Sequence, residues 1–541
     1  MRSSFPYGEL RIGVLIGYLM YNPSANFTPG NGWILGILGC ACLYFLCRFL
    51  LIGHPRLHIP LHLALLLWGI CEAVYGNLQL YGYYASNNGL YKMTGTFLNP
   101  GPFSGFLATI FPLALSYLLH PAKDSGYLPR IIRYVSGACL LLTLLLLPAG
   151  MSRAAWVAVI VGSLIVFGGY HSFRELFQKY DLRQKRKMLW GCSGLLVLLI
   201  VASVSVYYLK KDSADGRLLI WKITTQLIAE HPVTGVGAGN FAGAYGEAQA
   251  AYFNSGKNTP QETFVAGCPE YGFNEFLQIA AEHGIPALLL FLTVLVFAFR
   301  NARINRQYGI AGSLAAFLTF ACFSYPFSVP QSSILFALLL GCANSDFRPR
   351  PETCYRKQLL FTGIPLLILL FPLLRTGQQW KIRQEAIDSW KGEQTYYQMQ
   401  IYESATEHYR KLYPVLKDEP RFLFELGQCL SKTGAYEESN RILREGSRFS
   451  SDPMFWNIMG KNHQALKQYR EAEACFLRAG AMVPHRLYPL YLLAHLYFES
   501  QQTEKGIATA RTVISRTPKV MSAATEEMKA EMKEKLSTFT P

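Results

Sequence analysis

Long runs of apolar residues fill the chain before residue 376. A helix needs about 20 consecutive apolar residues to cross a bilayer. The runs that approach or reach this length cover residues 31–52, 59–76, 102–120, 130–149, 152–170, 188–208, 285–299, 309–324, 328–343 and 358–374. A weaker run at 8–21 carries Arg11, and because no small-residue cleavage site follows it, we interpret it as an uncleaved span. The pattern predicts an all-α, polytopic membrane bundle of about eleven spans over residues 1–375.

Lysine and arginine mark one side of this bundle. They gather in every second connection between the predicted spans. These residues are Arg48, Arg56, Lys123, Arg130, Arg133, the basic residues from Arg174 to Lys187, Arg300, Arg303, Arg306, Arg348, Arg350, Arg356 and Lys357. Because basic loops stay on the cytoplasmic side, the opposite side receives residues 77–101, the long loop 209–284 and the residues after 375.

A different pattern begins at residue 376. Residues 453–484 carry Trp456, Gly460, Tyr469, Ala472, Phe476, Ala479 and Pro484 at the spacing of the tetratricopeptide repeat, a helix–turn–helix unit of about 34 residues. Related units start at 386, 420 and 487, and residues 519–541 have the composition of a polar capping helix. We expect a tetratricopeptide solenoid over 376–541. It is either a rigid spacer or a surface that binds another protein or the chain's own membrane half.

Composition excludes several classes of protein. Of the 541 residues, 51% are hydrophobic and 16% are charged, which excludes a disordered or collagen-like chain and argues against an ordinary cytosolic enzyme. The formal net charge of +16 lies mostly between apolar runs, so it indicates orientation in a membrane and not nucleic-acid binding. The cysteines show no metal-ligand spacing, and most lie in the spans, where a free thiol behaves as a small hydrophobe.

Four polar motifs fall on the side opposite the basic loops. They are TGTFLNP (94–100), SRAAW (152–156), GRLLIW with HPVTGVGAGNF (216–221 and 231–241), and EYGFNEFLQ with EHGIP (270–278 and 282–286). Simpler interpretations are that TGTFLNP is only a turn before a helix, that Arg153 is an interfacial side chain, and that Arg217 is a solvated loop charge. The GVGAGN run follows no strand, so we interpret it as a backbone turn and not as a nucleotide loop. Glu72, inside the third span, either faces a cavity or is paired.

Arg153 and Arg217 suit a diphosphate, because guanidinium is permanently charged and donates paired hydrogen bonds to phosphate oxygens. A glycan carried on a lipid diphosphate would present that group near the outer membrane surface. Its transfer to an acceptor hydroxyl requires stabilisation of the departing diphosphate and a general base. Glu270, Glu275 and His283 are the candidates for the base. The further candidates for the substrate cavity are Glu72, Asn99, Trp221 and Asn274.

These motifs, in this order and on one side, resemble the O-antigen ligase/polymerase superfamily of bacterial inner-membrane glycan transferases over about residues 60–345. The resemblance implies a metal-independent enzyme, and we expect no cofactor. It would move a glycan from undecaprenyl diphosphate to a periplasmic acceptor, with Arg153 and Arg217 on the diphosphate. Many members have His-Asn where this chain has Phe273-Asn274, and that His is the proposed base. Glu275 is our leading substitute, since it lies about one helical turn from Tyr271.

The acceptor remains open. It is lipid A core in an O-antigen ligase, Ser or Thr of exported proteins in a protein O-oligosaccharyltransferase, or another lipid-linked unit in a polymerase. A periplasmic tetratricopeptide domain favours a protein contact. Outside enzymes, a membrane-anchored repeat scaffold would tolerate neutral substitutions at Arg153 and Arg217. A transporter should carry charges in several spans, whereas Glu72 is nearly alone.

Overall fold

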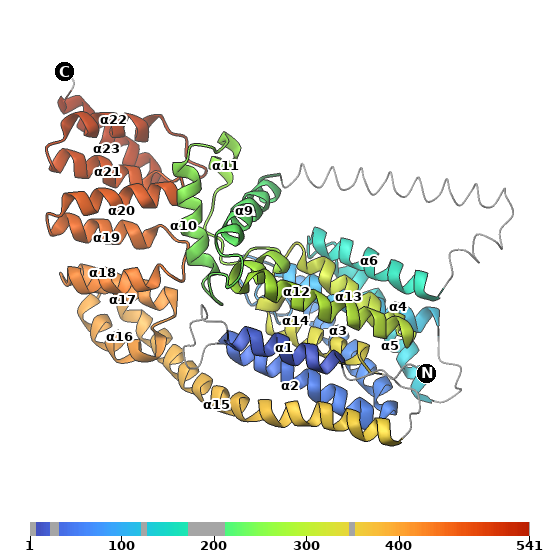
Figure 1. Cartoon of the computed structure of the whole chain (residues 1–541). Coiled ribbons are helices and arrows are strands. Elements are labelled where there is room, and N and C mark those ends of the chain that lie inside the picture. The colour runs from blue at the N-terminus through green and yellow to red at the C-terminus, as the bar shows by residue number, and fades with distance from the viewer. Residues whose placement is uncertain (1–6, 22–31, 121–126, 171–210, 346–351, 540–541) are drawn as a thin grey trace, which may run out of the picture.

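A computed structural model describes residues 7–21, 32–120, 127–170, 211–345 and 352–539 (Figure 1). Within these residues all regular secondary structure is helical, which confirms the expected fold class. The bundle contains α1 (Tyr7–Tyr21), α2 (Gly32–Gly53), α3 (His58–Leu80), α4 (Pro100–Leu119), α5 (Tyr127–Leu146), α6 (Arg153–Tyr170), α12 (Glu275–Ile304), α13 (Tyr308–Ala321) and α14 (Pro330–Ala343). The span expected at 188–208 and the basic segment before it lie outside the described residues.

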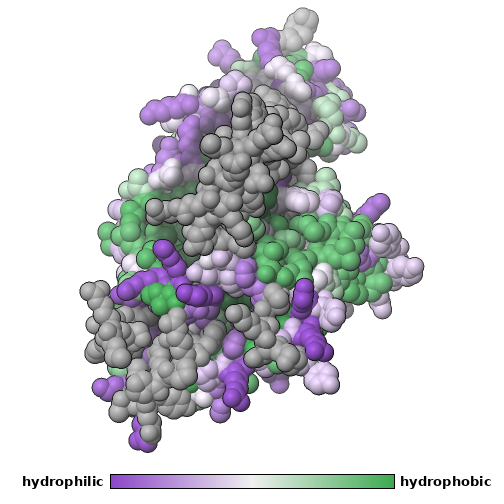
Figure 2. Space-filling model, turned by 90° about the vertical axis from the view of Figure 1, so that its right-hand side faces the viewer, coloured by the Kyte–Doolittle hydropathy of each residue, from purple (hydrophilic) through white to green (hydrophobic). Residues whose placement is uncertain are grey.

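The described helices fit a multi-pass membrane protein. Seven of them, including α15 (Glu352–Gln398), are long and apolar enough to cross a bilayer, and α13 and α14 are shorter apolar helices. Leu141 and Leu145 of α5, and Leu367 and Phe371 of α15, are exposed. Figure 2 shows hydrophobic surface across the middle of one face, with hydrophilic side chains above and below it. Large exposed apolar patches of this kind are rare on soluble monomers and suit a lipid-facing surface.

Helix α4 lies at the centre of the bundle, where Phe103 and Phe106 are fully buried. It packs against α5, α6 and α13. Gly162 of α6 and Gly312 of α13 let those two backbones touch, because a Cβ on either would lie 2.7 Å from the other's carbonyl oxygen. Small residues at helix crossings allow the close packing that holds membrane helices together. The starts of α4 and α6 meet at one end of the bundle, which we call the outer end, since a Cβ on Gly150, just before α6, would lie 2.0 Å from the Ser104 hydroxyl of α4.

The long helix α15 joins the bundle to the repeats without a break. Its first part packs along α2, and its last part pairs with α16 (Tyr402–Leu416). The domain boundary expected at 375/376 therefore falls inside a helix, and Figure 1 shows α15 running from the bundle into the repeats. A continuous helix is a stiffer connection than a Gly- or Ser-rich linker.

The repeats form a solenoid of antiparallel helix pairs, which we call the repeat array. After α16 come α17 (Pro420–Lys432), α18 (Tyr436–Gly446), α19 (Met454–Ala465), α20 (Tyr469–Met482), α21 (Tyr488–Glu499), α22 (Thr503–Ser515) and α23 (Ala523–Phe539). Helices α17, α19 and α21 begin within one residue of the predicted starts at 420, 453 and 487. The predicted small residues lie at close approaches; a Cβ on Gly460 would meet the Phe476 ring at 2.4 Å.

The segment expected as a long outer loop is folded. We call its helices α9 (Lys211–Glu230), α10 (Phe241–Asn254) and α11 (Pro260–Val265) the outer domain. Helix α10 packs against α20 of the repeat array (Figure 1). A Cβ on Gly243 would lie 2.0 Å from the carbonyl oxygen of Arg448, and Ser451 donates a hydrogen bond to the Pro269 carbonyl at 3.0 Å. The repeat array therefore contacts the chain's own membrane half.

Candidate active site

A cavity of about 540 Å³ lies where the outer end of the bundle meets the outer domain. Its walls come from the end of α3, the loop 81–99, the starts of α4 and α6, α9, and the turn between α13 and α14. The polar lining residues are Tyr91, Lys92, Asn99, Ser152, Arg153, Ser213, Arg217, Ser324 and Tyr325. The structure thus brings Asn99, Arg153 and Arg217, which the sequence places in three separate motifs, to one cavity.

Positive charge dominates this cavity. Lys92, Arg153 and Arg217 line it, and none of its described lining residues is Asp or Glu. Burial lowers the pKa of the Arg217 guanidinium, and the nearby charge of Arg153 lowers it further. An anion bound between the two arginines would remove this repulsion. The guanidinium of Arg217 is held by a 2.9 Å hydrogen bond that its Nη1 donates to the Phe323 carbonyl oxygen.

Two helix starts add to the positive potential. Asn99 caps α4, and its side-chain oxygen accepts a hydrogen bond from the Gly101 N–H at 2.8 Å. Ser152 precedes α6, and its hydroxyl accepts from the Ala155 N–H at 3.4 Å. Both starts line the cavity, and helix N-termini favour bound anions through their unpaired N–H groups and dipole. The prediction of a helix start at TGTFLNP and the prediction of a cavity residue at Asn99 are therefore compatible.

An aromatic wall stands beside Arg217. Phe273 lines the cavity with a positive φ of 50°, and its ring lies 5.2 Å from the Arg217 guanidinium carbon. Tyr325 packs against Phe273 and stacks on Tyr271, with ring centroids 4.5 Å apart in the stacked pair. Burial and the charge of Glu270 raise the pKa of Tyr271 to about 12. Phe273 thus lines the same cavity as Arg153 and Arg217.

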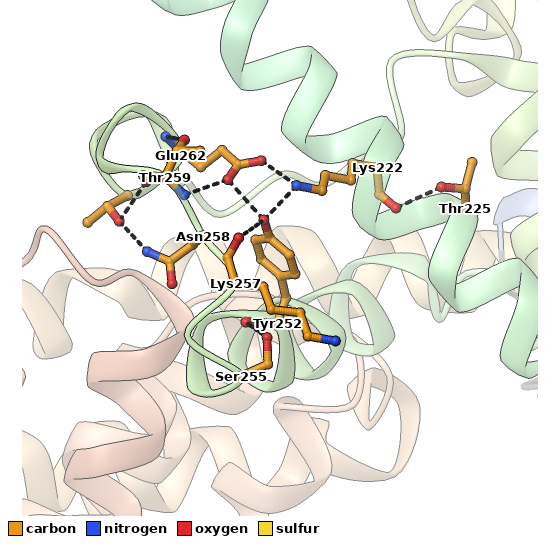
Figure 3. A network of polar contacts seen from close by, with 9 residues as sticks. Lys222, Thr225, Tyr252, Ser255, Lys257, Asn258, Thr259 and Glu262 are labelled. Atoms are coloured by element: carbon orange, nitrogen blue, oxygen red, sulfur yellow. Dashed lines mark hydrogen bonds and ion pairs between the residues drawn. The ribbon is translucent and has the colours of Figure 1, made fainter.

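The outer domain fixes the place of α9, which carries Arg217. The Trp221 indole N–H donates to the Gly272 carbonyl at 3.1 Å. Lys222 donates to Tyr252 at 2.6 Å and to Glu262 at 2.7 Å, and Tyr252 donates to Glu262 at 2.9 Å (Figure 3). Burial alone would raise the pKa of Glu262, but hydrogen bonds from Lys222, the Thr259 N–H and Tyr252 lower it to about 2. This network joins α9, α10 and α11.

The three candidate bases lie in different surroundings. Glu270 is exposed. The pKa of the cavity residue Tyr325 is raised by burial, by Tyr91 and by the nearby Glu270, in that order of size. Glu275 is buried, and its carboxylate accepts the Phe327 N–H at 2.7 Å. His283 is also buried, with its ring centroid 6.2 Å from that of Trp33. None of Glu270, Glu275 and His283 is among the described lining residues, so the structure does not bring the leading candidate, Glu275, to the cavity lining.

Glu72, Trp221 and Asn274, predicted for the substrate cavity, are not among its described lining residues. Glu72 is buried, and its carboxylate accepts the Thr96 N–H at 3.1 Å and the Thr96 hydroxyl at 2.6 Å, which holds loop 81–99 against α3. Asn274 caps α12 by accepting from the N–H groups of Phe276 and Leu277. The GVGAGN run packs on the kink in α12, where the Val236 N–H donates to the Ala281 carbonyl at 2.8 Å. These contacts are structural.

Sequence reasoning missed Lys92 and Tyr325. Lys92 is a basic residue on the side that receives few of them, seven positions before Asn99. The same imbalance had singled out Arg153, so the signal for Lys92 was present. Tyr325 carried no comparable signal, because a tyrosine in a turn between apolar helices is usual at a membrane interface.

Two protein-family models match this chain. Residues 138–292 match the O-antigen ligase family, and residues 387–446 match YpiA-like, C-terminal tetratricopeptide repeats. The first match contains Arg153, Arg217 and Phe273, and the second runs from the end of α15 to α18. No curated protein gives a significant match to the chain. Residues 138–292 thus match an O-antigen ligase domain, which supports a ligase- or polymerase-type glycan transferase of the membrane, and tetratricopeptide repeats follow it.

Proposed function

We propose that this protein transfers a glycan from undecaprenyl diphosphate to an acceptor hydroxyl at the periplasmic face of a bacterial inner membrane. The observation that carries this proposal is the cavity in which Lys92, Arg153 and Arg217 meet two helix starts and no carboxylate. A diphosphate has the charge and the oxygen geometry that such donors bind. The cavity lies at the end of the bundle where a lipid-anchored donor would expose its head group.

In the proposed reaction the acceptor oxygen attacks the anomeric carbon, and the bond from that carbon to the diphosphate oxygen breaks. The bonding electrons leave with the diphosphate, and the acceptor proton passes to a base. Arg153 and Arg217 stabilise the negative charge that develops on the leaving group. Because these guanidiniums and Lys92 can neutralise the diphosphate, the step requires no metal ion. Of the three candidates we propose Glu270 as the base, since it is exposed and contributes, after burial and Tyr91, to the raised pKa of the cavity residue Tyr325.

The basic loops support the proposed orientation. Arg300, Arg303 and Arg306 lie at the end of α12 and in the turn that follows, away from the cavity. This arrangement supports a cytoplasmic position for these residues and a periplasmic one for the cavity, the outer domain and the repeat array.

Lipid A core is the default acceptor, as for O-antigen ligases in general. A second candidate is a hydroxyl of an exported protein, and the docking of the repeat array on the outer domain favours it, because solenoids bind protein segments. Polymerisation of lipid-linked units uses the same donor and differs only in the acceptor.

Deletion of the gene in its native host tests the proposal and separates the acceptors. The glycan is followed on lipopolysaccharide and on exported proteins, with complementation by the wild-type gene and by Arg217→Ala. We expect loss of glycan from one of these pools, restored by the wild type alone. Loss from lipid A core indicates a ligase, loss from proteins an oligosaccharyltransferase, and shortened chains a polymerase. Full restoration by Arg217→Ala would contradict the proposed chemistry.

A further inference from the structure

Loop 81–99, which joins α3 to α4 at the outer end, turns large apolar and aromatic side chains outward. Tyr81, Tyr83, Leu90 and Leu98 are between 71% and 84% exposed, and Tyr84 is 56% exposed. Single exposed residues of this kind are common on any protein, but a group of them in one short loop marks an interaction site. The composition of the loop and the contacts on either side of it indicate what this face meets.

The loop carries almost no charge. Between residues 81 and 99 the only charged side chain is that of Lys92, which lines the cavity. A surface of Tyr and Leu suits the boundary between lipid and water, because tyrosine is enriched there with its ring toward the lipid and its hydroxyl toward the water. With no carboxylate, the loop also would not repel anionic lipid head groups.

Hydrogen bonds within the loop satisfy much of its backbone. The buried side chain of Gln79 accepts from the N–H groups of Thr94 at 2.9 Å and Gly95 at 2.7 Å. The Asn87 amide donates to the carbonyls of Gly95 at 3.1 Å and Phe97 at 3.2 Å. Unpaired backbone groups are costly where water is scarce. These bonds therefore suit a non-helical segment that lies partly immersed in a bilayer, and they fix which side chains point outward.

The outward face of the loop continues an exposed stripe of the span before it. Leu67 and Val74 of α3 are exposed. Tyr81, which follows Val74 at the same interval of seven residues, is the C-cap of this helix. Residues seven apart lie on nearly the same face of a helix. A surface that suits contact with lipid thus runs along α3 and into the loop.

We propose that loop 81–99 lies immersed among the lipid head groups of the leaflet on the cavity side, with its exposed tyrosines and Leu98 turned into the bilayer. Leu90 and Tyr91 also line the cavity, so the immersed loop holds the cavity mouth at the level of the head groups. Bulk water and a second copy of the chain are the competing occupants of this face, and the test separates them. The inference does not depend on the reaction proposed above.

The test uses the full-length protein in nanodiscs of phosphatidylethanolamine and phosphatidylglycerol. The photoreactive residue p-benzoylphenylalanine replaces Tyr83 in one variant and Leu98 in another, neither of which is among the described lining residues of the cavity. After illumination, mass spectrometry identifies the molecule to which each benzophenone is joined. We expect phospholipid adducts at both positions, in yields similar to that from the same replacement at Phe371, an exposed residue of the α15 span.

The matched negative control is the same replacement at Leu477, which is exposed in α20 of the repeat array and should give no lipid adduct. Three results would overturn the proposal. The first is the absence of lipid adducts at both loop positions when Phe371 gives them, which would place the loop in water. The second is attachment to another copy of the chain at both positions, and the third is an equal yield of lipid adducts at Leu477. Because the two loop side chains are exposed, the thermal unfolding midpoint of each variant should match that of the wild type.

Discussion

The guanidinium carbon of Arg217 lies 5.2 Å from the centre of the Phe273 ring. A cation is attracted to the face of an aromatic ring, whereas a protonated imidazole at this position would repel it. Phe273 therefore supports the charged form of Arg217 at the position where many related enzymes have the proposed base. Under the proposed function the general base is therefore another residue, while Arg153 and Arg217 still line the cavity.

Phe273→His should give the enzyme a new pH dependence. The introduced imidazole would line the cavity beside Arg217 and Arg153, whose charges lower its pKa below the usual value of about 6.5. Only neutral imidazole accepts a proton, so transfer should increase as the pH rises through that lowered value. The measurement compares the pH profiles of transfer by the wild type and the variant. Identical profiles would argue against a position of residue 273 next to the reacting groups.

Glu270→Gln should reduce transfer by about 10²- to 10⁴-fold, the usual effect of removing a general base. Because Glu270 is exposed, the thermal unfolding midpoint should not change. Glu275→Gln serves as the comparison, since its amide oxygen can still accept the Phe327 N–H and most activity should remain. If Glu275→Gln folded normally but lost activity while Glu270→Gln kept it, the buried carboxylate would be the base.

Gly243→Ala should separate the repeat array from the outer domain. The added Cβ would lie 2.0 Å from the Arg448 carbonyl oxygen, and relief of such overpacking typically costs about 1–3 kcal/mol. We expect faster hydrogen exchange in α10 and slower transfer, because α10 packs against α9 and thus supports Arg217. The control is Gly480→Ala in α20, where the nearest atom is 3.7 Å away. Equal exchange in the two variants would show that this interface is loose.

The outer domain should lose stability in acid. The pKa of Glu262 is lowered to about 2 from its ordinary value of 4.5, so its ionised form stabilises the fold above about pH 4.5, and this contribution disappears as the pH falls toward 2. Glu262→Gln removes the charge at every pH. The difference in unfolding midpoint between wild type and variant should therefore be largest near neutral pH and shrink in that window. A constant difference would mean that the Lys222–Glu262 pair contributes no ionic stabilisation.

The sequence predicted the architecture well because the apolar runs and the repeat spacing each extend over many residues. Apolar runs predict the bundle, and the spacing of residues such as Gly460 and Phe476 predicts the repeats, whereas the orientation drawn from the basic loops stays a prediction. Arg153 and Arg217 could also be singled out, because an arginine on the outer side goes against the charge bias.

What the sequence could not predict depends on packing between distant segments. The preference for Glu275 assumed that it would face the same cavity as Tyr271, but its carboxylate is turned toward the Phe327 N–H. Glu72 was left open between a cavity and a paired role, and only the fold shows its contacts with Thr96. The docking of α10 on α20 joins residues more than 200 positions apart, such as Gln249 and Met482. No local sequence pattern predicts such a contact.

The central claim is that two guanidiniums hold the diphosphate of the donor. The most direct measurement is the initial rate of transfer from purified undecaprenyl-diphosphate-linked glycan by the purified protein, in EDTA, for wild type and Arg217→Lys. Lysine keeps the charge but cannot donate paired hydrogen bonds, so we expect a rate about 10²- to 10³-fold lower, as for a lost transition-state donor. Arg511→Lys should have no effect. A full rate from a folded Arg217→Lys protein would contradict the claim.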